Sequence, residues 1–171
     1  MKNIGKIQKI ILFIMIAIIL AIGIYVLMTF LSKKKDDNAV SKVKFGYSLY
    51  ERDNSLYKDI FSNLKDNLNS DSINYDKYAE YITELFVIDF YSLNNKTSKN
   101  DVGGLQYLYP SMKDNFILNA TNTIYKYIVN DSNKNRDLPE VSSIELTSIE
   151  ESTFKIEDRE YESYTIKLDW T

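Results

Sequence analysis

The chain has 171 residues and contains neither cysteine nor histidine, which excludes disulfides, thiolate catalysis and the commonest general base and metal ligand. We therefore expect no cofactor and no metal site. The residues after position 35 hold all 24 acidic but only 15 basic side chains, a net charge of −9, which repels phosphate backbones and argues against a nucleic acid partner.

An uncharged run of 22 residues begins at Ile10 and ends at Leu31. As a helix it would be about 33 Å long, enough to cross the hydrocarbon core of a bilayer. The run is longer than a signal-peptide core and no small-x-small cleavage pattern follows, so it predicts an uncleaved anchor in the cell membrane. Lysines flank it on both sides. The position of the basic tail, residues 1–9, favours a cytoplasmic N-terminus and an extracytoplasmic domain.

Residues 32–54, which begin with charged and small side chains, predict a stalk, and residues 55–171 predict one domain. From Ser55 onward, apolar side chains recur at helical spacing and predict a helix with one buried face. These side chains are Leu56, Ile60, Phe61, Leu64 and Leu68. Polar residues 69–72 end the pattern.

A second and stronger helical pattern begins near Asn74, a good N-cap, and ends at residues 94–95. It is apolar on most sides, which predicts the central helix of the domain. Asp89 falls on the apolar face between Phe86 and Leu93. A buried acid is either satisfied by a hydrogen bond or ion pair, or lines a ligand pocket. We favour the satisfied form, because buried acids are usually paired.

Gly103 and Gly104 predict a tight turn between helices, since the lysine and serine or threonine of a phosphate-binding loop are missing. Pro110 then suits the first turn of a third helix. Apolar side chains at four-residue steps predict its buried stripe: Met112, Phe116, Ala120, Ile124 and Tyr127 with Ile128.

After residue 139 the apolar period changes to two, which predicts antiparallel strands with a turn at Asp158 and Arg159. Helices followed by strands indicate an α+β fold, with the helices packed on a curved antiparallel sheet. The expected core is Phe61, Leu64, Ile82, Phe86, Phe116, Ile124, Ile166 and Trp170.

Two further groups of side chains could carry chemistry. Asp76, Glu80 and Glu84 are spaced to share one helical face, which we interpret as a solvated face. Thirteen tyrosines follow the anchor. Six of them could form a stacking surface for sugar or peptide, or they could belong to the core. These six are Tyr47, Tyr50, Tyr107, Tyr109, Tyr161 and Tyr164. The candidate pocket or interaction residues are Asp89, Tyr91, Tyr107, Tyr109 and Trp170.

The basic tail, single span, stalk, long buried helix at residues 78–93, Pro-started helix and antiparallel sheet together resemble a known layout. It is similar to single-pass assembly factors of type IV secretion and conjugation channels, whose outer domain is a nuclear-transport-factor-like (cystatin-like) roll. It also resembles anchored, uncharacterised proteins of Gram-positive bacteria with the same roll. The resemblance implies a non-enzymatic scaffold that contacts other membrane proteins as a homo-oligomer. Those rolls usually end in a longer sheet than residues 138–171 provide.

From the sequence we therefore expect a membrane-anchored, non-enzymatic binding or scaffold module of a bacterial cell-envelope assembly. Its partners would be the lipid bilayer, other envelope proteins and further copies of itself. A conjugation or type IV secretion channel component is one alternative. The other is a small-ligand-binding or enzymatic cup that uses Asp89 and nearby tyrosines.

Overall fold

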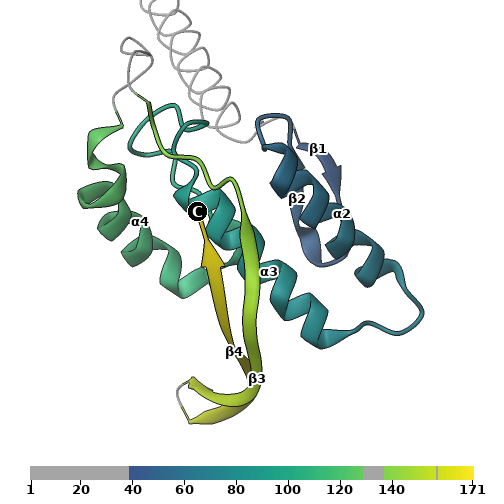
Figure 1. Ribbon diagram of the computed structural model, residues 1–171. Coiled ribbons are helices and arrows are strands. Elements are labelled where there is room, and N and C mark those ends of the chain that lie inside the picture. The colour runs from purple at the N-terminus through teal and green to yellow at the C-terminus, as the bar shows by residue number, and fades with distance from the viewer. Residues whose placement is uncertain (1–38, 129–136, 157) are drawn as a thin grey trace, which may run out of the picture. The chain divides into compact units, whose positions relative to one another are not determined.

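The computed structural model describes residues 39–128, 137–156 and 158–171, which form an α+β fold (Figure 1). These residues contain three α-helices and two antiparallel sheets of two strands each. None of these helices has the length and apolarity that a membrane span requires. The predicted anchor, residues 10–31, lies outside the described residues.

Helix α2, Ser55–Asn69, confirms the first helical pattern. The side chain of Asn54 caps it by accepting a hydrogen bond of 2.8 Å from the Tyr57 N–H, which satisfies a donor that the helix itself cannot pair. Four of the five predicted side chains are buried, namely Ile60, Phe61, Leu64 and Leu68. Leu56 is half-buried, and Tyr57, which the pattern did not include, is buried.

Helix α3, Tyr75–Tyr91, is the central helix, as predicted. Asn74 caps its start by accepting a 2.9 Å hydrogen bond from the Lys77 N–H. The helix ends at Tyr91, earlier than the sequence pattern suggests, because the Leu93 N–H instead donates to the Pro139 carbonyl at 2.8 Å. Neighbouring elements on several sides pack against it, namely α2, the 3₁₀ turn η3 (Leu105–Tyr107) and both strands of the C-terminal hairpin.

Two apolar clusters meet at α3. The first joins α2 to the middle of α3 and is formed by Tyr57, Ile60, Phe61, Leu64, Leu68, Leu85, Ile88 and Val141. The second joins the end of α3 to the segments that follow it and is formed by Phe90, Leu93, Val102, Ala120, Tyr125 and Ile128. The expected core residues Phe61 and Leu64 are buried, whereas Ile82, Phe86 and Phe116 are half-buried at the edges of these clusters.

Residues 39–54, which the sequence assigns to a stalk, are folded. They form strand β1 (Ala39–Lys42), a 3₁₀ turn and strand β2 (Ser48–Tyr50). Val43, Tyr47 and Leu49 pack against the first apolar cluster. The folded part of the chain therefore begins before residue 55.

The predicted third helix is broken into three pieces. A 3₁₀ turn, Pro110–Met112, leads into helix α4, Lys113–Asn122, and a second 3₁₀ turn, Ile124–Tyr127, follows the break at Thr123. Three side chains at the end of α4 donate to its own carbonyls and compete with the helical hydrogen bonds; they belong to Thr121, Asn122 and Thr123. The predicted stripe was therefore wrong at Met112, Ile124 and Tyr127, which are exposed, and it missed the buried Tyr125. Ala120 and Ile128 are buried, as predicted.

The alternating C-terminal pattern forms an antiparallel hairpin of strands β3, Ile144–Ile156, and β4, Arg159–Trp170. Ile144 pairs with Trp170 at its base, and Ile156 pairs with Arg159 next to the bend. Arg159, which the sequence assigns to the turn, already belongs to β4. A bulge interrupts the register between Leu146 and Ser148.

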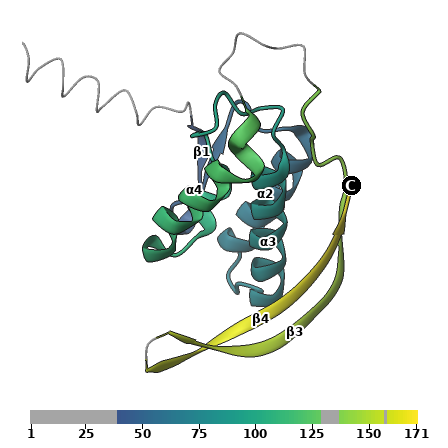
Figure 2. The same ribbon diagram turned by 90° about the vertical axis from the view of Figure 1, so that its left-hand side faces the viewer.

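No described side chain of this hairpin is fully buried, so the core assignment of Ile166 and Trp170 was wrong. Ile166 is half-buried and Trp170 is 43% exposed. Because the sheet has only two strands, one face covers α3 while the other stays open to solvent. Figure 2 shows the hairpin curving past α3, with its bend extending beyond the helix.

Candidate functional site

Asp89 lies on α3 against the loop that follows the helix. The Lys96 Nζ lies 2.5 Å from its Oδ1, and the Gly104 N–H donates to its Oδ2 at 2.6 Å. The Lys96 side chain is fully buried. Asp89 is therefore held as one half of an ion pair, which is the structural interpretation of a polar residue on an apolar face.

The two glycines of the predicted turn let this loop approach α3. A Cβ on Gly103 would lie 2.0 Å from the backbone oxygen of Asp89, and Gly104 adopts a positive φ of 78°. The Gly103 N–H also donates to the Tyr125 hydroxyl at 3.0 Å. The glycine pair is thus required by close packing, as the turn interpretation predicts.

Other charged groups surround Asp89 without forming an open cup. Asp53 accepts a 2.7 Å hydrogen bond from the Tyr50 N–H, and burial raises the pKa of its carboxyl group. Arg52 pairs with Asp101 at 2.8 Å. The narrow gap beside Asp89 has no room for a water molecule and is lined by Asp53, Asn54, Tyr57, Ile88, Asp89, Ser92 and Asn95.

The candidate Tyr107 belongs to a hydrogen-bonded cluster of aromatic side chains. Its hydroxyl contacts that of Tyr57, and the Gln106 amide donates to both. The Tyr47 ring stacks on the Tyr107 ring, and the Tyr47 hydroxyl lies 2.7 Å from the Tyr78 hydroxyl. Burial raises the pKa of Tyr47, Tyr57 and Tyr107, which keeps these phenols protonated.

The remaining candidates lie elsewhere. Tyr109 is exposed at the start of the broken third helix. Tyr91, the last residue of α3, packs against Trp170 of β4 with 4.5 Å between ring centroids. Of the five candidate residues, Tyr91 and Trp170 therefore pack against each other, whereas Asp89, Tyr107 and Tyr109 lie elsewhere.

The acidic row of α3 is not the solvated face that the sequence suggests. Asp76 is exposed, but Glu80 and Glu84 are only 8% and 7% exposed. Lys77 pairs with Glu80 at 2.7 Å. Burial, followed by the charge of Glu80, raises the pKa of Glu84 to about 7, whereas Lys77 acts in the opposite direction.

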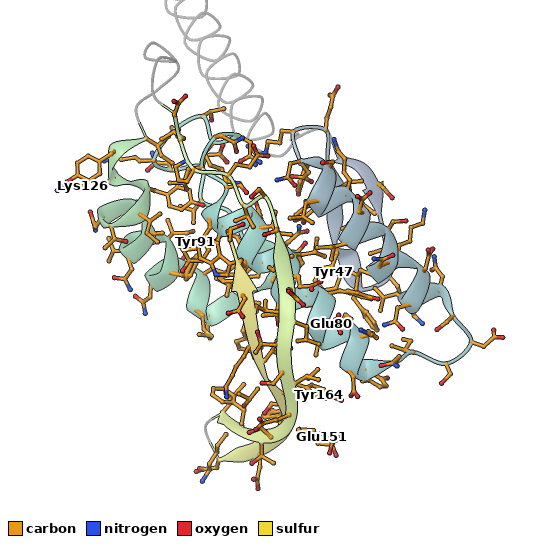
Figure 3. The ribbon with its side chains drawn as sticks, viewed as in Figure 1. Tyr47, Glu80, Tyr91, Lys126, Glu151 and Tyr164 are labelled. Carbon is orange, nitrogen blue, oxygen red and sulfur yellow. The ribbon has the colours of Figure 1, made fainter. Side chains whose placement is uncertain are left out.

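The hairpin covers this row, which explains the burial. Trp170 contacts Tyr91 at one end of α3, and the Tyr164 hydroxyl lies near Asp76 in the first turn of the helix. Figure 3 shows Tyr91, Glu80 and Tyr164 along the path of the hairpin. The sequence signal that could have predicted this burial is the alternation of apolar side chains in β4, because the apolar face of such a strand must pack on another element.

Beyond Tyr164 the hairpin leaves the helices. We define its tip as residues 152–163; the described residues of this tip are exposed, apart from the half-buried Ile156 and Ser163. Phe154 and Tyr161 are direct cross-strand partners, 57% and 46% exposed. The tip holds four acidic and two basic side chains. An open hollow of about 580 Å³ lies on the hairpin, lined by Glu151, Ser152, Thr153, Glu162, Ser163 and Tyr164.

Within the described part of the chain, no three acidic side chains are grouped so that they could hold a metal ion. Comparisons with protein family models, curated proteins and solved structures find no match to this chain. The geometry therefore distinguishes two regions, a closed polar centre at Asp89 and an exposed aromatic tip on the hairpin.

Proposed function

We propose that this chain is a membrane-tethered, non-enzymatic binding module of a bacterial cell-envelope assembly, and that the hairpin tip is its contact surface. The observation that carries the proposal is the pairing of Phe154 with Tyr161, two exposed aromatic rings on a projecting hairpin. Aromatic side chains are enriched where proteins bind one another, because they bury a large apolar area on association.

The charge of the tip indicates the kind of partner. Acidic side chains such as Glu160 and Glu162 flank Tyr161. Complementary charge speeds encounter and selects the correct partner. The surface fits an apolar recess with a basic rim on another envelope protein.

The anchor and the orientation are part of the same proposal. The uncharged run of residues 10–31 supports a single span, and the basic tail before it supports an extracytoplasmic position for the domain. Helices combined with a curved antiparallel hairpin support kinship with nuclear-transport-factor-like rolls. The layout supports a conjugation or type IV secretion channel as the setting.

A ligand-binding or enzymatic cup at Asp89 is the second candidate, and its geometry is unfavourable. Lys96 and the Gly104 N–H engage the two carboxylate oxygens. The adjacent space admits no water. A substrate would have to displace a buried ion pair, which leaves a charge uncompensated.

A photo-crosslinking amino acid placed at residue 154 of the full-length chain tests the proposal in membranes of the organism that carries the gene. After alkaline washing, the chain should remain in the membrane pellet. Irradiation should yield one discrete adduct heavier than the 20.0 kDa chain, because the tip contacts a defined partner. An adduct of twice the chain mass would identify that partner as a second copy.

Leu118 provides the matched control, since it is exposed to a similar extent on α4, outside the hairpin. A crosslinker at residue 118 should give no discrete adduct. Equal adducts from both positions, or none from residue 154, would contradict a docking role for the tip. Release of the intact chain by the alkaline wash would contradict the anchor.

A further inference from the structure

Two carboxylates of α3 lie beneath the hairpin. Glu80 and Glu84 are one helical turn apart and both are buried. The ammonium group that pairs with Glu80 belongs to Lys77, whose side chain is half exposed. Two buried acids beside one partly solvated cation are costly when both are ionised, since like charges repel and burial penalises each of them.

The cover over these carboxylates is β4. Its contacts through Trp170 to Tyr91 and through Tyr164 to Asp76 bracket both glutamates. Fifteen residues of helix rise about 22 Å, and six residues of strand span about 20 Å. The strand therefore runs alongside the helix between these two contacts, past Glu80 and Glu84.

The face of the hairpin that meets α3 is apolar. Ile166 and Leu168 alternate in phase with Tyr164 and Trp170, so they share the inner face. Their cross-strand partners on the same face are Ile149 and Leu146, and all four are half-buried. The hairpin thus offers these carboxylates apolar contacts in place of water.

Few charges offset this burial. On α3 itself, Glu80 and Lys77 act on Glu84 in opposite directions. On the hairpin, Lys167 and Asp169 alternate to the outer face, whereas Tyr164 lies near the carboxylates of Asp76, Glu151 and Glu162. The neighbouring turn η3 contributes the protonated phenol of Tyr107. On α2, the charged side chains are exposed, namely Lys58, Asp59, Lys65 and Asp66.

We propose that the β3–β4 hairpin is a proton-controlled strap, which stays on α3 while the Glu80–Glu84 pair holds a proton and lifts from α3 when both carboxylates are ionised. Unlike the proposed function, this inference concerns regulation, and it does not depend on what the tip binds. Lifting returns water to both glutamates and removes the contact between Trp170 and Tyr91.

The direction of the pH dependence follows from the titration of Glu84. Its pKa lies near 7 under the hairpin and near 4.5, its ordinary value, once solvated. The closed form therefore binds the proton more tightly, and raising the pH from 4.5 through 7 weakens hairpin docking. A difference of this size corresponds to a change of up to about 300-fold in the closing equilibrium.

Trp170, the single tryptophan of the chain, reports on the strap directly. In the full-length chain in mild detergent, acrylamide quenching of Trp170 should roughly double as the pH rises through about 7, because the ring is 43% exposed while it lies on Tyr91. Far-UV circular dichroism should not change over the same range. Glu84→Gln, which mimics the protonated side chain, should keep quenching low at every pH.

Glu150→Gln is the matched control, since Glu150 is exposed on the same hairpin. It should leave the wild-type transition in place. A flat wild-type profile, or an unchanged transition in Glu84→Gln, would overturn the strap. Loss of the circular dichroism signal at the same midpoint would also overturn it, because global unfolding would then explain the change in Trp170.

Discussion

Replacing Lys96 with methionine is expected to destabilise the domain by about 3–5 kcal/mol, the cost typical of breaking a buried ion pair from one side. The Lys96 side chain is fully buried and its Nζ lies 2.5 Å from Asp89. Without Lys96, the Asp89 carboxylate loses its cationic partner and keeps the hydrogen bond from the Gly104 N–H. Chemical unfolding of the full-length chain, followed by far-UV circular dichroism, measures this loss.

The exposed Lys99 is the matched control, and Lys99→Met should change stability by less than about 0.5 kcal/mol. In the double variant Asp89→Asn with Lys96→Met, most of the lost stability should return, because neither charge is then left buried alone. Equal stability of Lys96→Met and Lys99→Met would contradict the ion pair as the organising contact of this region.

Gly103→Ala is the second substitution with a large expected effect, about 3 kcal/mol or more. The new Cβ would lie 2.0 Å from the Asp89 carbonyl oxygen and 2.6 Å from its carbonyl carbon. Both atoms belong to the α3 backbone, so the clash cannot be relieved by a change of rotamer. The loop would have to move away, weakening the bonds from Gly103 to Tyr125 and from Gly104 to Asp89.

Gly46→Ala separates the clash from the ordinary cost of losing a glycine. Gly46 has a φ of +85°, but a Cβ added there would meet no atom within 4 Å. Its replacement should therefore cost only about 1–2 kcal/mol for the left-handed backbone. Thermal unfolding of the two variants side by side provides the comparison. If Gly103→Ala were the milder of the two, the close approach between this loop and α3 would be wrong.

Local sequence signals predicted the elements whose stability is local. Apolar spacing predicted α2 and α3, and the N-cap at Asn74 was also predicted, whereas the N-cap at Asn54 was not. The third helix failed because the periodicity ignores side chains that bond to the backbone, as Thr123 does at the end of α4. Its break shifts the phase, so Tyr125 is buried in place of Ile124.

Tertiary contacts explain what the sequence could not predict about the candidate residues. The position of Asp89 on an apolar face identified it as a residue in need of a partner, but Lys96 lies in a loop whose path no pattern specifies. The burial of Glu84 depends on a hairpin far along the chain folding back over α3. The alternation of β4 predicted a covered face without saying which helix it covers.

We propose that this chain works through the hairpin tip and not through chemistry at Asp89. The most direct measurement is the amount of partner that co-purifies with the tagged full-length chain from membranes. Phe154→Ser with Tyr161→Ser should lose the partner and keep the wild-type unfolding midpoint, because both rings are exposed. Asp89→Asn with Lys96→Met should keep the partner. The reverse pattern would contradict the account.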